Sequence, residues 1–387
     1  MIRIDVLTTT RAEYGLMRPL IRRMIADPDI QMNLLVTGTH LSEKYGNTYK
    51  EIERDGFPIT AKIPILGESS GAVGVSQTMA NAIVEFTKFF IANRPDFVLV
   101  DGDRYETLGI CIAAVNANVP IIHCSGGATT EGAADECYRH SMTKMAYLHF
   151  PTTEIYRNRI IQMGESPDRV FTVGSMGLEN ILQIDYLSKE ELSEQIGWSL
   201  IKPFSVVTFH PVTLENNTCK QQLNELLRAC ETRQDMQFIF TKANADNGGD
   251  EINQILDEYT ASSTNAICVT SLGAVRYLSA LKYAEFVMGN SSSGIIEAPS
   301  MKIPTINIGD RQRGRLQAQS IINCAPKTAD ILNAINKALS PEFKDFCKHV
   351  VNPNGDGKTS ERIVSHIKEY CSTHQVDIMK KFYDLPK

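Results

Sequence analysis

Long apolar runs are missing from this chain of 387 residues. None of its hydrophobic stretches approaches the roughly 20 residues that a helix needs to span a bilayer. Residues 1–7 carry charges and lack both a basic leader and a small-residue cleavage site. They fit a strand better than a signal peptide, so the sequence predicts a cytoplasmic protein without a membrane partner.

Positive charge is also scarce. The chain has 39 Lys and Arg against 45 Asp and Glu, which gives a formal net charge of -6. Nucleic acids and anionic membranes are bound largely through an excess of basic side chains. The charge balance therefore argues against both as bulk partners, and an anionic ligand has to be held by a few local cations.

Paired cysteines and a dinucleotide fingerprint are absent as well. The nine cysteines are scattered and form no Cys-x-x-Cys pair, which indicates reduced thiols and neither a disulfide framework nor a structural zinc site. Residues 8–15, after the first predicted strand, read TTTRAEYG and not Gly-x-Gly-x-x-Gly. We therefore expect no metal site and no dinucleotide site of that type.

What the chain does have is a regular alternation of short apolar runs, rich in Val, Ile and Phe, with longer amphipathic segments. This pattern is typical of βαβ units and a mostly parallel sheet, and the length suits two domains. We therefore predict an α/β fold of two doubly wound, Rossmann-like domains. The predicted strands are 2–7, 32–37, 97–100, 120–123, 148–151 and 170–173, followed by 205–209, 237–241, 267–270, 286–288 and 304–308.

The boundary between the two halves falls in the least strand-like interval, 178–203, which contains a charged stretch and the sole Trp198. We place the first domain at 1–180 and the second at 181–364. The tail, about 365–387, is expected to pack back on the first domain.

In open α/β sheets, ligands bind outside the carboxyl ends of the strands, so the loops there are the places to search. Arg11 follows the first strand and opens a helix, where it meets an anion or is simply an exposed residue after an N-cap. Asp101, Asp103 and Arg104 crowd the end of another strand. Two carboxylates and a guanidinium at a strand end favour working groups over helix caps.

The next loop contains a glycine pair, Gly126 and Gly127, and a polar stretch that ends in Glu131. Glycines allow a ligand to approach the backbone closely. On the helix that follows, Asp135 and Arg139 are four residues apart and share a face. A surface ion pair is the alternative explanation for these two residues.

In the second half, His210 stands just past a predicted strand, where a histidine is a stronger candidate than elsewhere. A hydroxyl-rich loop with Ser291 and Ser292 opens a helix and suits phosphate, although a serine cap is the alternative. Glu297 could accept hydrogen bonds from ribose hydroxyls. Arg311 is one of three guanidiniums in the segment 309–315.

Taken together, these motifs resemble the hydrolysing UDP-N-acetylglucosamine 2-epimerase family. The resemblance implies a two-domain, glycosyltransferase-B-like fold with the ligand in the cleft between the domains, and a homo-oligomer, a dimer or a tetramer. The matching segments follow one another along nearly the whole chain: 10–14, 37–41, 45–48, 102–104, 135–140, 210–211, 289–292 and 307–311.

The reaction implied by the resemblance converts UDP-N-acetylglucosamine and water to N-acetylmannosamine and UDP, and a close relative uses UDP-diacetylbacillosamine. Carbon 2 of the sugar has no neighbouring carbonyl, so the route is elimination of UDP to a glycal followed by hydration, with no redox cofactor. The acid–base set carried over to this chain is Asp103, Glu131, Asp135 and His210. The UDP-binding set carried over is Arg11, Arg104, Asn244, Ser291, Ser292, Glu297 and Arg311, again with His210.

Two positions depart from the family pattern. Relatives read Gly-Gly-Glu where this chain has Ala128 after its glycine pair, and they have His or Glu where Ser125 stands. Either another carboxylate such as Glu131 takes over, or activity is lost or altered. A nucleotide-sugar-binding protein without turnover therefore stays open as a hypothesis, as does a non-hydrolysing epimerase or glycosyltransferase on the same fold.

Overall fold

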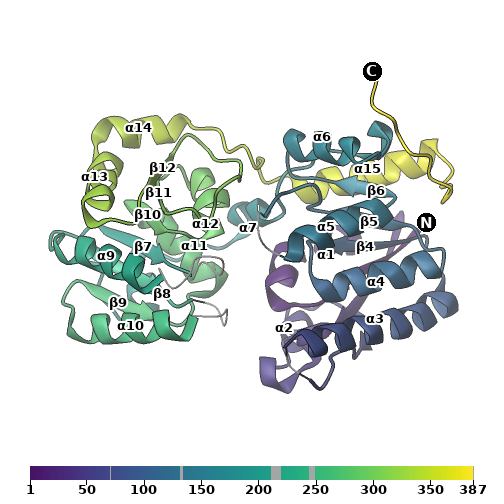
Figure 1. Ribbon diagram of the computed structural model, residues 1–387, viewed down its shortest axis with the longest axis horizontal. Coiled ribbons are helices and arrows are strands. Elements are labelled where there is room, and N and C mark those ends of the chain that lie inside the picture. Colours follow the sequence, from purple (N-terminus) through teal and green to yellow (C-terminus); the bar gives the residue numbers. More distant parts are fainter. Residues whose placement is uncertain (70, 131–133, 211–218, 244–248, 387) are drawn as a thin grey trace. The chain divides into compact units, whose positions relative to one another are not determined.

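The computed structural model describes residues 1–69, 71–130, 134–210, 219–243 and 249–386 (Figure 1). The chain forms two compact units. The first consists of Met1–Asn180 with Asn354–Lys387, and the second of Ile181–Pro353. Each unit contains its own six-stranded sheet.

The sheet of the first unit is parallel, with the strand order β3-β2-β1-β4-β5-β6. This is the Rossmann order, in which the direction of winding reverses between β1 and β4. Parallel sheets are covered on both faces, which explains why β4 is almost continuously apolar and why the last five residues of β1 are all buried. The strands are β1 (Ile2–Thr8), β2 (Ile30–Thr37), β3 (Ile59–Ile63), β4 (Phe97–Asp101), β5 (Ile121–Cys124) and β6 (Leu148–Phe150).

Helices cover both faces of this sheet (Figure 1). The apolar sides of α1 and α15 share one core with Ile4 and Val6 of β1, whereas α3, α4 and α5 share the other core with Leu7. Neighbouring residues of β1 thus serve opposite faces, as the pleat requires. The helices are α1 (Arg11–Ala26), α2 (Tyr49–Arg54), α3 (Gly71–Asn93), α4 (Tyr105–Asn116), α5 (Ala134–Met145), α6 (Glu154–Gln162) and α15 (Thr359–Thr373), while α7 (Gly177–Gln183) contains the boundary between the two units.

The end of the chain is fastened to the first unit by polar contacts. The Tyr370 hydroxyl of α15 lies 3.0 Å from the hydroxyl of Tyr147, and the Lys380 ammonium donates to Glu165 at 2.8 Å. The backbone amide of Tyr383 donates to the Gly164 carbonyl at 2.9 Å. These bonds place the last turns of the chain beside β6 and α6.

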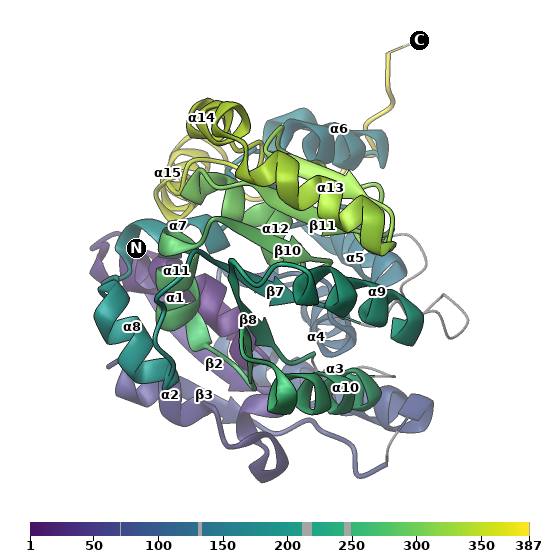
Figure 2. The same ribbon diagram turned by 90° about the vertical axis from the view of Figure 1, so that its left-hand side faces the viewer.

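The second unit repeats the same topology in a parallel sheet of order β12-β11-β10-β7-β8-β9, so its winding reverses between β7 and β10. In Figure 2, α9, α10 and α13 lie on one side of this sheet and α8 and α11 on the other. The strands are β7 (Phe204–Thr208), β8 (Gln237–Thr241), β9 (Ala266–Val269), β10 (Phe286–Gly289), β11 (Thr305–Ile308) and β12 (Ile321–Cys324). The helices are α8 (Lys189–Ile196), α9 (Cys219–Glu231), α10 (Gly249–Ser262), α11 (Gly273–Tyr283), α12 (Ser292–Ile296), α13 (Thr328–Leu339) and α14 (Pro341–His349).

α8 lies in the interval 178–203, where no strand was predicted, and its two ends carry clear helix-capping signals. The Ser188 hydroxyl accepts from the Glu191 amide, and the Glu191 carboxylate accepts from the Ser188 amide, which makes a capping box. Gly197 ends the helix in the left-handed conformation, at φ +69°.

Three details of the predicted strands were wrong. The edge strands β3 and β12 were not predicted, and 170–173 is not a strand: it has one isolated bridge, between Val170 and His149. The amide of Phe171 still donates to the His149 carbonyl at 2.9 Å, so this segment runs beside β6 without continuing the sheet. Within the described ranges, no helix is long and apolar enough to cross a bilayer, and all nine cysteines are free thiols.

Candidate functional site

The carboxyl end of β1 leads directly into α1, where Thr10 is the N-cap. Glu13, in the first turn, folds back so that its carboxylate accepts from the Thr9 amide at 3.2 Å and from the Thr9 hydroxyl at 2.7 Å. Gly38 is close by: a Cβ at this position would lie 2.7 Å from the Thr9 carbonyl oxygen. Arg11 projects outward, since its side chain is 60% exposed and forms an ion pair with Glu51 at 3.2 Å.

The loop after β4 brings charged groups of both signs together. The guanidinium of Arg104, which is 41% exposed, donates to Glu106 at 2.6 Å. Gly102 adopts φ +77°, and its carbonyl oxygen lies 2.8 Å from Nε2 of the buried His123. Asp103 follows, and its side chain is 31% exposed. Asp103 and Arg104 thus remain accessible at the point where the winding of the sheet reverses.

Arg139 of α5 ties this loop to the loop after β5. Its Nε donates to Asp103 at 2.9 Å, one terminal nitrogen donates to Glu136 at 2.7 Å and to the Ala128 carbonyl at 3.0 Å, and the other donates to the Thr130 hydroxyl at 2.8 Å. The alternative explanation, a surface ion pair between Asp135 and Arg139, is not supported, because the ion pairs of Arg139 go to Asp103 and Glu136. Arg139 is only 3% exposed, so it is an interior brace and not half of a surface ion pair.

Several carboxyl groups of this first cluster hold protons unusually firmly. Burial, with a smaller contribution from the negative charge of Asp101, raises the pKa of Glu13 to about 8. Burial, with a contribution from Asp103, raises the pKa of Asp101 to about 6, although the Ser125 hydroxyl opposes the shift. The pKa of Asp135 is raised too, first by desolvation and then by Asp103. Carboxyl groups that exchange protons near neutral pH suit acid–base chemistry.

In the second unit, hydrogen bonds connect the residues that follow the neighbouring strands β7 and β10. The His210 amide donates to Oδ1 of Asn290 at 2.7 Å, and Nδ2 of Asn290 donates to the His210 carbonyl at 2.9 Å. Gly289 is required here because a Cβ would come within 1.9 Å of the Thr208 carbonyl oxygen. Arg311 joins the cluster by donating to the Asn290 carbonyl at 3.1 Å.

Hydroxyl groups follow at the start of α12. The Ser291 side chain caps the helix by accepting from the Ser293 amide at 3.4 Å, and Ser292 is the first helical residue. The Ser293 hydroxyl is hydrogen-bonded to the hydroxyl of the partly buried Tyr277. α12 has only five residues, so its dipole is weak. The predicted attraction of this helix start for an anion therefore depends mainly on the hydroxyls and on Arg311.

Glu297 ends α12 with one carboxylate oxygen buried and, among the described residues, without a hydrogen-bond partner. Burial raises the pKa of this side chain to about 7. A buried acceptor of this kind is stabilised when a ligand hydroxyl donates to it.

The structure thus gathers the predicted site residues into two clusters, one at the winding reversal of each sheet. The predicted residues Glu131 and Asn244 lie outside the described residues. Sequence reasoning named Asp101 at the end of its strand but missed Glu13, Asn290, the partly buried Tyr277 and Gln312, whose side chain donates to the Asn290 carbonyl at 2.8 Å. Only Asn290, next to the predicted Ser291, carried a local signal, namely its place directly after a strand.

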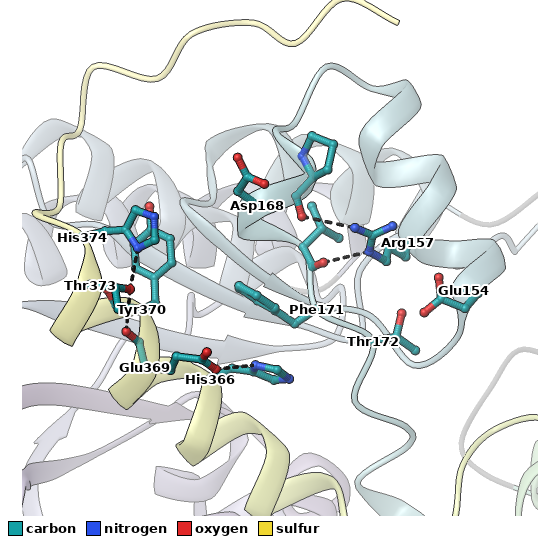
Figure 3. Close-up of a pocket in the computed structure, with 12 residues that line it drawn as sticks. Glu154, Arg157, Asp168, Phe171, Thr172, His366, Glu369, Tyr370, Thr373 and His374 are labelled. Carbon is teal, nitrogen blue, oxygen red and sulfur yellow. Dashed lines mark hydrogen bonds and ion pairs between the residues drawn. The ribbon is translucent and has the colours of Figure 1, made fainter. Parts of the chain in front are cut away.

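A separate hollow of about 550 Å³ lies between α6 and α15 in the first unit (Figure 3). His366 stacks on Phe171 and His374 stacks on Tyr370, each with ring centroids 4.5 Å apart. Arg157 is occupied, since it donates to the carbonyl of Val170 at 2.9 Å. None of the predicted site residues that the structure describes lines this hollow, so it is not the candidate site.

Comparison with known proteins shows the family of the chain. The family model of UDP-N-acetylglucosamine 2-epimerase matches residues 22–368. The chain belongs to the UDP-N-acetylglucosamine 2-epimerase family. The fold class is confirmed as well: two Rossmann-like α/β sheets in the glycosyltransferase-B-like fold of these epimerases.

Among the relatives of this epimerase-family chain is the GDP/UDP-N,N'-diacetylbacillosamine 2-epimerase (hydrolyzing) of Campylobacter jejuni, which is 40% identical over 88% of both chains. The polysialic acid biosynthesis protein P7 of Escherichia coli is 39% identical over the whole of this chain and 98% of that protein. A crystal structure of the UDP-GlcNAc 2-epimerase from Neisseria meningitidis, bound to UDP-GlcNAc, superposes with a TM-score of 0.76 over 95% of this chain and 100% of that one, at 18% identity.

Proposed function

We propose that this protein is a hydrolysing 2-epimerase that converts a UDP-2-acetamido sugar and water to the free 2-epimeric sugar and UDP. The observation that carries the proposal is the cluster at the winding reversal of the first sheet, where Asp103 lies among carboxyl groups with raised pKa values and next to the accessible guanidinium of Arg104. Such a cluster supplies both proton donors and proton acceptors at neutral pH.

The chemistry needs both kinds of group. A base takes the hydrogen from carbon 2 while the carbon 1–oxygen bond breaks and UDP leaves, which gives a glycal. Water then adds to carbon 1, and a proton is delivered to carbon 2 on the opposite face. Asp103, Glu131, Asp135 and His210 are our candidates for these proton transfers.

The second cluster is our candidate for holding UDP. Ser291 and Ser292 offer hydroxyls to the diphosphate, Arg311 offers a guanidinium, and the unpartnered oxygen of Glu297 accepts from a ribose hydroxyl. Asn244 and His210 complete this set in the second unit. Arg11 and Arg104 are the candidate cations from the first unit.

The substrate is UDP-N-acetylglucosamine or a related sugar such as UDP-N,N'-diacetylbacillosamine. The relative in Campylobacter jejuni is named for the latter sugar, and the protein in the Neisseria meningitidis crystal structure is bound to the former. Both sugars carry the 2-acetamido group, so the elimination chemistry is the same for both. The difference between them lies at other ring positions.

Incubation of the pure protein with each sugar nucleotide in deuterated water, followed by proton NMR, tests the proposal. We expect UDP together with a free sugar of inverted configuration at carbon 2 that carries deuterium there. Asp103→Asn should abolish this product while UDP binding survives. A sugar that stays attached to UDP points to a non-hydrolysing epimerase, and transfer of the sugar to an added acceptor points to a glycosyltransferase.

A nucleotide-sugar-binding protein without turnover is the second candidate. It is favoured by positions 125 and 128 of the loop after β5, because Ser125 and Ala128 are not ionisable whereas the family resemblance implies acidic or basic residues there. UDP binding by calorimetry without any product from either sugar nucleotide would support this second candidate.

A further inference from the structure

Asp101 is the last residue of β4, Ser125 directly follows the neighbouring strand β5, and their side chains are joined by a hydrogen bond. Asp101 is paired in register with Cys124, and the Ser125 hydroxyl donates to Oδ1 of Asp101 at 2.7 Å. The amide of Ser125 donates to the Phe150 carbonyl at 3.1 Å, which fixes its backbone from the other side. The pair is therefore a built part of the strand ends and not a chance contact between mobile side chains.

The backbone of Ser125 adopts a conformation that few residues with a side chain adopt. Its φ is +63°, in the left-handed region, where glycine and asparagine are favoured. Left-handed backbone at other residues costs free energy and is found where a site demands it. Ser125 thus retains a hydroxyl at a position where glycine would fit with less strain.

The two members of the pair differ in their access to a ligand. Asp101 is only 5% exposed, whereas Ser125 is partly exposed. The acidic groups that face Asp101 are Glu13 from α1, Asp103 from the loop after β4 and the thiol of Cys124 from β5. Within the part of the chain that the structure describes, Asp101 forms no ion pair with a basic side chain. These surroundings therefore favour protonation of the Asp101 carboxylate. The Ser125 hydroxyl is hydrogen-bonded directly to the carboxylate oxygen that would take the proton.

We propose that Ser125 and Asp101 form a proton relay that accepts the proton of the attacking water during the hydration step. The inference rests on the proposed function, because it assigns a role within that reaction. Ser125 is the residue that contacts the water, and Asp101 is a positioning and proton-storing residue that acts through it.

In the hydration step the relay moves two protons. One O–H bond of the water breaks as its oxygen uses that electron pair to bond to carbon 1 of the glycal. The released proton bonds to Oγ of Ser125, while the original Ser125 proton moves to Oδ1 of Asp101 and neutralises the carboxylate. The carbon 1–carbon 2 double bond breaks at the same time, and carbon 2 uses that electron pair to take a proton from a separate acid of the cluster. After the sugar leaves, the two relay transfers run backwards and return the proton to solvent.

Three substitutions separate a relay from a merely structural hydrogen bond. Ser125→Gly removes the hydroxyl and suits the left-handed backbone. Ser125→Asn tolerates the same backbone and keeps a donor toward Asp101, but an amide does not pass a proton on. Asp101→Asn keeps the size of the side chain and removes the acid.

We expect kcat for UDP release by the natural protein to rise with pH through an ionisation near the Asp101 pKa of about 6. Each of the three variants should lose this limb of the pH profile and about 10²-fold or more of kcat, as for other groups that transfer protons. UDP affinity by calorimetry should stay unchanged. Infrared difference spectra between the natural protein and Asp101→Asn should contain a carboxyl band that titrates over the same pH range.

The infrared titration does not depend on turnover, so the two ideas fail separately. If UDP is released but Ser125→Gly and Ser125→Asn retain the natural pH limb, or if no carboxyl band of Asp101 titrates there, the relay is overturned and the epimerase proposal stands. If Ser125→Asn alone keeps natural kcat, the hydroxyl serves only as a donor and the relay is overturned too. If the natural protein releases no UDP from either sugar nucleotide, the proposed function is overturned and the relay with it.

Discussion

The side chain of Asn290 binds both backbone polar groups of His210, with one bond of 2.7 Å and one of 2.9 Å. His210 and Asn290 are each nearly fully buried, so these backbone groups have lost their water. The carbonyl of Asn290 in turn accepts from Gln312 at 2.8 Å and from Arg311 at 3.1 Å. One asparagine therefore connects the ends of β7 and β10 to the arginine of the loop after β11.

Replacing Asn290 by alanine should destabilise the protein and weaken UDP binding together. The free energy of unfolding should fall by about 1–3 kcal/mol, the cost of leaving buried donors and acceptors unpaired. Urea unfolding and calorimetry with UDP measure the two effects. Asn336→Ala, which removes only an exposed contact with Arg233, should change neither. A stable Asn290→Ala protein with natural UDP affinity would show that the hydrogen bonds of Asn290 do not support the UDP site.

The sequence predicted the central strands of both sheets because buried strands produce clear apolar runs. Strands β4, β7 and β10 are buried along their whole length, so each appears in the sequence as a mainly apolar run that ends in a polar loop. In β1 the apolar run is interrupted by Arg3 and Asp5, although its last five residues are buried. The edge strand β3 alternates partly buried and exposed residues over only five positions. Such a short, half-exposed run does not differ from a loop in sequence alone.

The same limit explains the segment 170–173. Its composition is that of a strand, but a run becomes a strand only if a neighbour offers its hydrogen-bonding edge, and here one bridge to β6 forms. Pairing depends on residues far away in the chain, which the local pattern does not contain.

For the candidate site, sequence order revealed which residues follow strands, but not which of them meet. The helical spacing of Asp135 and Arg139 left a surface ion pair between them as one explanation. Arg139 binds Asp103 instead, from a loop 36 positions earlier. The burial of Asp101 beside Ser125 likewise arises because β4 and β5 are adjacent in the sheet. Contacts of this kind follow from strand order, which the sequence pattern did not specify.

Arg311→Ala should weaken UDP binding by about 1.5–3 kcal/mol, the range for a hydrogen bond to a charged group. The expectation follows because Arg311 donates to the carbonyl of Asn290, the residue before Ser291, whose hydroxyl is a candidate ligand of the diphosphate. Arg313→Ala is the matched control, because it removes an exposed guanidinium from the same loop. Calorimetry that gives the two variants equal affinity for UDP would show that only general charge matters.

His40 should make the protein less stable as the pH falls from about 6.5 toward 4. The ring is fully buried, and burial lowers its pKa from 6.5 to about 4. Between these values the unfolded chain binds a proton that the folded chain refuses, so stability rises with pH across this window. The whole effect amounts to about 3 kcal/mol, at 1.36 kcal/mol for each pKa unit.

Urea unfolding of the natural protein and of His40→Gln at several pH values checks this expectation. At pH 7 the variant should be clearly less stable, since the contacts of the ring with the hydroxyls of Thr8 and Thr48 are lost. That difference should shrink toward pH 4, because the natural protein loses its advantage there. A penalty that is the same at both pH values would mean that His40 does not titrate as its burial implies.

Ala128→Glu should increase the rate of UDP release. The Ala128 carbonyl is held by Arg139 at 3.0 Å, and the same guanidinium binds Asp103, so residue 128 is fixed in the loop beside the candidate acid–base cluster. Ala128 is partly exposed, which leaves space for a longer side chain. A glutamate there would bring a further proton acceptor toward the sugar, and general bases contribute roughly 10²–10⁴-fold to rates when they reach the proton they abstract.

Ala128→Gln adds a side chain of nearly the same size without the charge, so it should leave the rate at or below the natural value. Equal rates for the glutamate and glutamine variants would show that a carboxylate at this position has no access to the substrate. If the natural protein is already fast and Glu131→Gln abolishes turnover while UDP binding persists, Glu131 supplies the base instead.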